Sequence, residues 1–526
     1  MSILWGQLRP GQDRAMASGG CDRRNDARKA SVGSACKTIY EVFLGLAVVG
    51  AVYWGGCKPA SPVKAPAPDV PPPGTQFRLV VVGDPELASA IEVLRGEWNA
   101  QSGWDFSVKT LDESAEPKTL EAIWTLADAA VLPVGWLPSV ATGDPEAPPL
   151  AEVPANLREA EGGPWGRIFG TLRVRELTWG NRAVAVPFGS PVFVLYCRED
   201  WLEKLGEKPP QTWDAYQRLV QRLAAARQQA ETNLSAGGAA SDWVPALEPL
   251  AAGWAGRLLL ARTAAYVAHR EHFSTFFDIE TMEALVDRPP FVRALQELCA
   301  AVRGAESTVL TLDPDGVRKA FWEGRCALAI TWPTASAEIQ LQETPPEVVF
   351  AELPGSRDVF DPRKAQWQKR RADEPIQVPL LGVSGRLGVV SQSTRWPAAV
   401  FQLLFWLSAD RSWEVSSKSR TTTLYRDDHL QDPLRWVEPL LSPQAALQYA
   451  ELTRETLDKT VAIVAVPLPG HNEYLSILDD AVRRAVKGEL SAEAALREAA
   501  EGWNELTERS GRDRQRQAYW QSLGLE

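Results

Sequence analysis

Histidine and cysteine are scarce in this chain, and the common catalytic motifs are absent. Only four histidines and six cysteines occur among 526 residues. His269 and His272 stand three residues apart in "HREH"; we interpret them as part of an exposed helical face, because no further metal ligand follows. His429 and His471 are isolated. The chain has no nucleophile elbow, phosphate-binding glycine loop or H-E-x-x-H zinc motif. It therefore predicts no catalytic residues, no metal and no cofactor.

Basic residues are fewer than acidic residues. The chain has 56 lysines and arginines against 67 acidic residues, a net charge of -11. Proteins whose main partner is a nucleic acid usually carry a basic surface, so that class is excluded. What is present is apolar material: 45% of the residues are hydrophobic and 21 are tryptophan. Such a chain can bury a large interior, and its length exceeds what one core usually organises, which predicts two lobes or domains.

Long apolar runs are missing, with one exception near the N-terminus. Val42 to Trp54 form an apolar run of about 13 residues, shorter than the ~20 that a membrane-spanning helix needs. Basic residues precede this run, and Gly55, Gly56 and Cys57 follow it. This order is typical of a signal peptide, and small residues before a cysteine are typical of a bacterial lipoprotein. We predict that processing makes Cys57 the lipid-bearing first residue of the protein; plain secretion or an uncleaved anchor are the alternatives.

The segment after Cys57, "KPASPVKAPAPDVPPPG", predicts a stiff proline-rich spacer. Three cysteines then remain, and none has a Cys-x-x-Cys spacing. Cys197 and Cys326 lie in apolar runs, which favours buried thiols.

Strands and helices alternate after the spacer. "FRLVVVG" and "WDFSVKTL" are typical of strands, and the amphipathic "PELASAIEVLRGEWNAQSG" between them is typical of a helix. A helix "TLEAIWTLA" and a strand "DAAVLPVG" follow, so a parallel sheet begins here. Residues 212–325 are mostly helical in pattern and lead into the strand "CALAIT".

Five segments resemble a known family in the family's own order. They are "RAVAVPFGSPVFVLYCREDWLEKLGEKPPQTWDAY", "RKAFWEGRCALAITW", "FAELPG", "GRLGVVSQSTRWPAAVFQLLFWLS" and "RRAVKGELSAEAALREAAEGWNEL". The chain is similar in these to the extracellular solute-binding proteins of family 1, receptors of ATP-binding-cassette importers, many of them for sugars. The resemblance covers residue 76 to about 507. Cys197 stands where Tyr or Asn is common, and "SRDVFDPRKAQWQKRRADE" looks like an insertion.

The resemblance implies an α/β fold, the two-lobed periplasmic-binding-protein fold of type II, with crossover strands joining the lobes and a ligand cleft between them. Pro187 to Pro191, "PLLGVSGRLGVVS" and "RTTTLYRDD" would be the crossovers. The expected divisions are a leader (1–57), a proline-rich linker (58–75), a first lobe (76–187 and 381–430) and a second lobe (188–380, with C-terminal helices at 431–526).

The resemblance also suggests where a solute would be held, since ligands of open α/β sheets lie beyond the carboxyl ends of the strands. Asp84 and Trp136 follow strands of the first lobe, and Trp332 follows one of the second; Trp254 and Tyr474 begin helices, and Arg386 lies near a crossover. Sugars need aromatic platforms and polar partners, which these residue types supply. The alternative for each tryptophan is a place in the core, and for Arg386 and Arg420 a plain surface charge.

The function implied is an extracytoplasmic, membrane-anchored receptor, expected to be a monomer. It would capture a small polar solute, by expectation a carbohydrate, through hinge closure and deliver it to importer permease subunits. A sensor with a signalling partner is one alternative. A secreted glycan-active enzyme is another, because two catalytic carboxylates need only meet in space.

Overall fold

A computed structural model describes residues 70–114, 116–142, 150–233, 242–339 and 345–525. The predicted leader, most of the proline-rich linker and Cys57 lie outside these ranges. No helix within them is both long and apolar enough to span a membrane.

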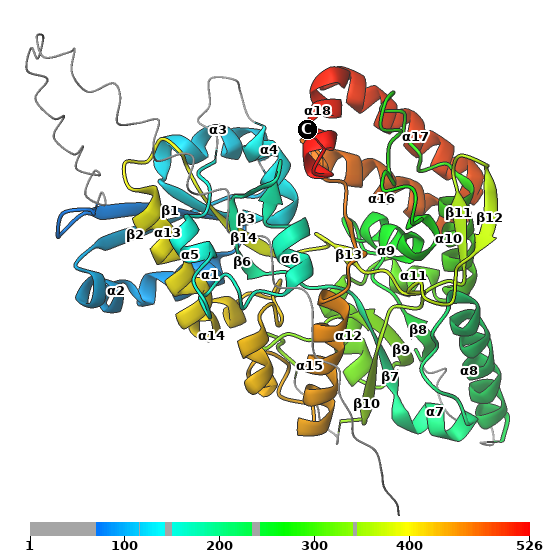
Figure 1. Ribbon diagram of the computed structural model, residues 1–526. Coiled ribbons are helices and arrows are strands. Elements are labelled where there is room, and N and C mark those ends of the chain that lie inside the picture. Colours follow the sequence, from blue (N-terminus) through cyan, green and yellow to red (C-terminus); the bar gives the residue numbers. More distant parts are fainter. Residues whose placement is uncertain (1–69, 115, 143–149, 234–241, 340–344, 526) are drawn as a thin grey trace, which may run out of the picture. The chain divides into compact units, whose positions relative to one another are not determined.

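The first lobe is built on a five-stranded sheet (Figure 1). Its strands are β1 (Gln76–Val82), β2 (Asp105–Leu111), β3 (Ala129–Pro133), β6 (Ala185–Gly189) and β14 (Arg386–Val390), in the order β2-β1-β3-β14-β6. β1 runs parallel to β2 and β3, as the sequence pattern predicts, whereas β14 is antiparallel to both of its neighbours. The predicted first helix is divided at Leu94 into α1 (Pro85–Val93) and α2 (Arg95–Ser102). Helices α3 (Glu116–Leu126) and α13 (Pro397–Phe405) also pack on this sheet.

The second lobe has a four-stranded sheet in the order β10-β7-β9-β8. Its strands are β7 (Val194–Arg198), β8 (Val244–Leu247), β9 (Cys326–Thr331) and β10 (Val348–Glu352). All of β9 is buried, as its unbroken apolar sequence requires. Around this sheet lie α8 (Trp213–Asn233), α9 (Ala255–Val267), α10 (Pro289–Ala301), α12 (Pro314–Trp322) and α15 (Pro443–Leu457). Helices α16 (His471–Val486) and α17 (Ala492–Arg509) pack on each other, and α16 also packs on α9.

Shorter elements complete the two lobes. In chain order they are η1 (Val134–Trp136), α4 (Leu137–Ala141), α5 (Ala155–Arg158), α6 (Gly170–Arg175), β4 (Thr178–Trp179), β5 (Arg182–Ala183), α7 (Glu199–Leu205), α11 (Glu306–Val309), β11 (Asp358–Asp361), β12 (Gln366–Lys369), β13 (Leu380–Leu381), η2 (Trp406–Asp410), α14 (Ser412–Val415), η3 (Ser416–Lys418), η4 (Asp427–Gln431), η5 (Pro433–Arg435), β15 (Ile463–Val464) and α18 (Arg512–Ser522). The charged segment that resembles an insertion contains the hairpin of β11 and β12.

Three connections between the lobes pack against one another. A Cβ atom at Gly189, the last residue of β6, would lie 2.3 Å from Oγ1 of Thr422 in the third connection. A Cβ atom at Gly385, just before β14, would lie 2.2 Å from the carbonyl oxygen of Gly189. Both glycines also have a positive φ, 148° and 110°. Only glycine allows this close approach, so the crossovers form one tightly packed hinge.

The helical interpretation of "HREH" is wrong. Helix α9 ends at Val267, and Ala268 leaves the helical conformation with ψ at 79°. His269 and His272 instead face each other across an antiparallel bridge, with ring centroids 5.0 Å apart, and His269 is buried. The helical pattern of "GWAGRLLLARTAAYVAHR" runs into these residues without a glycine or proline after Gly256, so the sequence did not indicate that the chain reverses there.

Candidate functional site

Two of the predicted tryptophans meet beside the hinge. Trp332 directly follows β9, and Trp254 is the residue before α9. Their ring centroids lie 5.7 Å apart. Phe193, in the connection between β6 and β7, completes the cluster, with its ring 5.7 Å from Trp332 and 6.5 Å from Trp254. Sequence reasoning missed Phe193, because an apolar residue beside a strand is typical of a core.

The two tryptophans differ in access. Trp332 is only 2% exposed, and its Nε1 donates a hydrogen bond to the carbonyl oxygen of Arg420 at 3.3 Å. Trp254 is half-buried, and the guanidinium of Arg257 lies 5.5 Å from its ring centroid, within the range of a cation–π contact. Trp254 is therefore the more accessible aromatic surface in this arrangement of the lobes.

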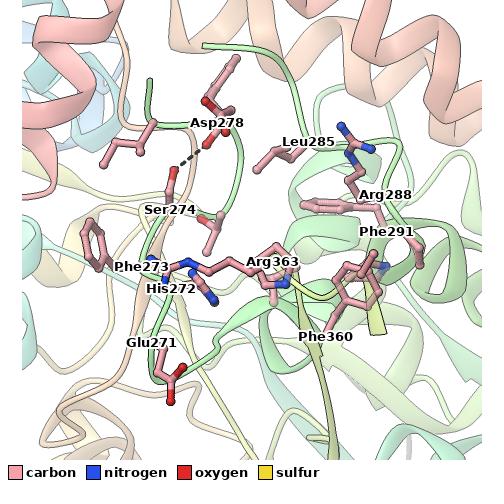
Figure 2. Close-up of a pocket in the computed structure, with 18 of the residues that line it drawn as sticks. Glu271, His272, Phe273, Ser274, Asp278, Leu285, Arg288, Phe291, Phe360 and Arg363 are labelled. Atoms are coloured by element: carbon pink, nitrogen blue, oxygen red, sulfur yellow. Dashed lines mark hydrogen bonds between the residues drawn. The ribbon is translucent and has the colours of Figure 1, made fainter. Parts of the chain in front are cut away.

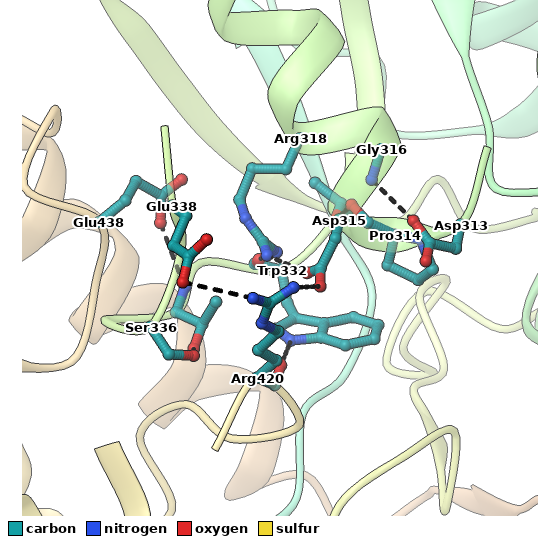
Figure 3. Close-up of polar contacts among 12 residues, drawn as sticks. Asp313, Pro314, Asp315, Gly316, Arg318, Trp332, Ser336, Glu338, Arg420 and Glu438 are labelled. Carbon is teal, nitrogen blue, oxygen red and sulfur yellow. Dashed lines mark hydrogen bonds and ion pairs between the residues drawn. The ribbon is translucent and has the colours of Figure 1, made fainter. Parts of the chain in front are cut away.

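Charged side chains surround Trp332 (Figure 3). Nη1 of Arg318 donates to the carbonyl oxygen of Trp332 at 2.7 Å, and Nη2 of Arg318 pairs with Asp315. Asp315 also faces Nη1 of Arg420 at 3.8 Å, and Nη2 of Arg420 faces Glu338 at 3.5 Å. The Arg420 side chain is 52% exposed and that of Asp315 is 34% exposed. Both can therefore reach a bound polar molecule.

A buried carboxylate holds the loop after Trp332 in place. Glu438 accepts hydrogen bonds from the Tyr196 hydroxyl at 3.0 Å, from Nε1 of Trp322 at 3.1 Å and from the backbone nitrogen of Thr334 at 3.1 Å. Burial raises the pKa of Glu438, and the charge of Arg318 opposes that shift. Burial alone would lower the pKa of Arg318, but the charges of Glu438 and Asp315 raise it overall. Arg318 therefore remains a cation beneath Trp332.

On the first lobe, Asp84 and Arg386 lie together at the end of β1. Asp84 is buried; its Oδ1 accepts from the backbone nitrogen of Leu87 at 3.0 Å and caps α1, and its Oδ2 accepts from the Ser419 hydroxyl. Nη2 of Arg386 pairs with Glu113 at 2.9 Å and donates to the carbonyl oxygen of Gly83 at 3.2 Å. Arg386 is therefore not a plain surface charge. Glu113 could not be singled out from the sequence, because its partner Arg386 is remote in the chain.

Glu113 also lies across from the second lobe. Burial lowers the pKa of Arg257, and the charges of Glu113 and Asp479 oppose that shift. The cation beside Trp254 is thus within electrostatic reach of a first-lobe carboxylate. Both groups also contact one connection between the lobes, since Asp84 accepts from the Ser419 hydroxyl and Trp332 donates to the carbonyl oxygen of Arg420.

Trp136 and Tyr474 do not join either group. Trp136 is fully buried, and in the described part of the chain its Nε1 has no hydrogen-bond partner. Tyr474 is fully buried on α16, where its hydroxyl shares a hydrogen bond with Oγ1 of Thr507 at 2.9 Å and its ring packs edge-on against Trp503. Their burial favours the core alternative, and their role as ligand contacts stays a prediction.

A hollow of about 740 Å³ lies elsewhere, on the second lobe (Figure 2). Its walls come from the loop at residues 271–280, the start of α10 and the turn of the β11–β12 hairpin. Figure 2 shows His272 and Arg363 across from the phenyl rings of Phe291 and Phe360. None of the six predicted ligand residues lines this hollow.

The described residues include no cluster of three or more His, Cys, Asp or Glu side chains placed to hold a metal. Cys197 and Cys326 are buried free thiols, and burial raises the pKa of both. Such thiols are poor nucleophiles at neutral pH, since the thiolate is the reactive form.

The model of the family described as "Bacterial extracellular solute-binding protein" matches residues 130–411, more than half of the chain. The chain belongs to this family. Its members are extracytoplasmic binding proteins.

Solved structures of low sequence identity share the fold. Maltose-bound MalE3 of T. maritima has 18% identity and a TM-score of 0.57, with 82% of this chain and 100% of that chain covered. The sugar-binding protein MalE of Xanthomonas citri has 16% identity and a TM-score of 0.59, with 83% and 98% covered. A solute-binding protein of Agrobacterium vitis S4 with bound D-mannitol has 15% identity and a TM-score of 0.55, with 83% and 99% covered. The predicted two-lobed α/β fold is confirmed.

Proposed function

We propose that this protein captures a carbohydrate or a similar polyhydroxylated solute between its lobes and delivers it to the permease of an ATP-binding-cassette importer. One observation carries the proposal above all. Trp254, Trp332 and Phe193 gather beside the hinge, at the carboxyl end of β9, where ligands of this fold class are held.

The chemistry around this cluster suits a sugar. A sugar ring has an apolar C–H face that stacks on an indole and a rim of hydroxyl groups that bond to charged side chains. Trp254 offers the half-buried ring, and Arg420 and Asp315 offer partly exposed polar groups nearby. The structural neighbours named with maltose and D-mannitol support this class of solute.

Lobe closure is the proposed mechanism of capture. We propose the division expected from the sequence: residues 76–187 and 381–430 in the first lobe, and 188–380 and 431–526 in the second. It is supported by β14 in the first sheet and by the packing of α15 against β10 of the second. Three crossovers leave rotation about the hinge as the simplest relative motion.

A lipid on Cys57 would hold the protein at the outer face of the membrane, with residues 58–75 as a spacer. The protein would act as a monomer and bind its solute without altering it. This is consistent with a site built from stacking and ion-pairing groups.

A thermal-shift panel of mono- and oligosaccharides and polyols tests the solute class. A ligand at 100 times its dissociation constant stabilises the folded state by about 2.7 kcal/mol, which gives a clear rise in melting temperature. The matched variant Trp254→Ala, with a Kd about tenfold higher, should keep only about half of that stabilisation at the same solute concentration. A panel without any shift, or one in which the added sugar is recovered as cleavage products, would overturn the proposal.

A further inference from the structure

A buried carboxyl group joins two of the three crossovers. Glu176 lies between α6 and β4 and is only 3% exposed. Its Oε1 accepts a hydrogen bond from the backbone nitrogen of Gly382 at 2.6 Å, in the connection from β13 to β14. Its Oε2 accepts from the hydroxyl of Ser190, in the connection from β6 to β7. A single side chain thus fixes the spacing of two hinge segments.

Among the residues that the structure describes, no cation is paired with this carboxyl group. Burial raises the pKa of Glu176 to about 7, and the hydrogen bonds from Ser190 and Gly382 oppose that rise. Arg175 lines the adjoining hollow from the same segment, and Arg386 is paired with Glu113. His471 approaches Gly135 from α16, and burial lowers its pKa to about 4, so it is neutral near pH 7.

The hollow beside Glu176 is shared by both lobes. It has a volume of about 30 Å³. Its lining includes Val134 and Trp179 of the first lobe and Val464 and Pro467 of the second lobe. A rotation that separates these walls admits water to the carboxyl group. Hydration favours the carboxylate far more than the neutral acid, so ionisation and this rotation are coupled.

We propose that Glu176 is a positioning residue of the hinge: its protonated form stabilises the lobe arrangement described here, and its ionisation favours rotation that opens the shared hollow. In the protonated form the Oε2 hydroxyl donates to Oγ of Ser190, while Oε1 still accepts from Gly382. Both hinge contacts therefore survive without a buried charge. The inference rests on the proposed closure about the crossovers, and it adds a dependence on pH near neutrality.

Pulsed EPR distances between the lobes of the full chain, without any solute, test this inference. Spin labels carried by non-canonical amino acids at positions 93 and 447 suit the purpose, because Val93 of α1 is 80% exposed and Leu447 of α15 is 59% exposed. As the pH rises from about 5.5 to about 8.5, across the pKa of about 7, the distribution of distances between the labels should gain a second maximum. Glu176→Gln, which is always neutral, should keep the low-pH distribution at both pH values.

Two controls separate the possible causes. Glu161→Gln alters an exposed carboxyl group of the same lobe and should leave the pH response unchanged. If Glu176→Gln fails to fold, Ser190→Ala keeps the carboxyl group but removes one partner; it should move the midpoint of the distance change to higher pH, since the ionised form loses a donor. A distribution independent of pH in the unmodified chain, or an unaltered response in the folded variant, would overturn the inference. Because no solute is present, failure here leaves the proposed solute binding untouched.

Discussion

The ring centroids of Trp254 and Trp332 lie 5.7 Å apart, at an interplanar angle of 47°. In the sequence, the helices from α9 to α12 and strand β9 lie between these two residues. Their unequal burial divides two roles. The half-buried ring of Trp254 is available for stacking on a solute, and the buried ring of Trp332 packs against it.

Replacement of Trp254 should therefore act mainly on affinity. Loss of one stacked aromatic contact weakens binding by on the order of 1 to 2 kcal/mol, and 1.4 kcal/mol is a factor of about ten in Kd. Trp254→Ala should raise Kd about tenfold, and Trp254→Phe should recover part of the loss. Isothermal titration with the solute found in the thermal-shift panel measures both. An unchanged Kd in folded Trp254→Ala would remove this residue from the site.

Replacement of Trp332 should act mainly on stability. Truncation of a buried tryptophan to alanine costs about 3 to 5 kcal/mol, because it leaves a cavity. Denaturant unfolding of Trp332→Ala should show a loss of this size. If the variant instead keeps its full stability and loses affinity, Trp332 is itself the stacking platform.

The two arginines beside Trp332, Arg318 and Arg420, should contribute unequally to the stability of the fold. Arg318 is buried and paired with Asp315, and it faces the buried Glu438, so Arg318→Ala leaves uncompensated charge and should cost about 3 to 5 kcal/mol. Arg420 is exposed, and its ion pairs should contribute at most about 1 kcal/mol, less at high salt. Unfolding curves of Arg318→Ala and Arg420→Ala test this contrast. Equal losses would contradict the assigned geometry.

The dependence of stability on pH offers a separate test of Glu176. Its folded-state pKa of about 7 lies above its unfolded value, so its contribution is complete below about pH 4.5 and is lost as the pH rises through 7. The full loss is on the order of 3 kcal/mol. The free energy of unfolding in urea should be compared between Glu176→Gln and the unmodified chain. As the pH rises from about 5 to about 8, across the pKa of about 7, the variant should become more stable relative to the unmodified chain. A difference that does not vary with pH would show that the carboxyl group stays ionised.

Cys57 carries the prediction about anchoring. If a thioether-linked lipid is the anchor, Cys57→Ser should move the protein from the membrane fraction to the soluble fraction. Fractionation followed by immunoblotting measures this. Continued membrane retention would favour the alternative of an uncleaved apolar helix at Val42 to Trp54.

The sequence was a good guide to what local pattern determines. Unbroken apolar runs predicted β1, β3 and β9. Trp332 was singled out because it follows a strand, and Trp254 because it begins a helix. The orientation of a side chain is decided by its neighbours in space, so Trp136 and Tyr474 could be placed at an element's end but not seen to be buried.

Residues that act through remote partners were missed for the same reason. Glu176 has the sequence surroundings of a charged residue at a helix end, and only the fold brings Ser190 and Gly382 to it. Glu113 and Glu438 meet their arginine partners through contacts between distant segments. Single-sequence patterns carry no signal for such pairs.

Solution scattering of the chain with and without its solute tests most directly whether this protein captures a solute by closing its lobes. Closure rotates the two lobes toward each other about the packed hinge at Gly189 and Gly385. The radius of gyration should therefore fall at saturating solute. A radius of gyration that is the same with and without saturating solute would contradict closure about this hinge.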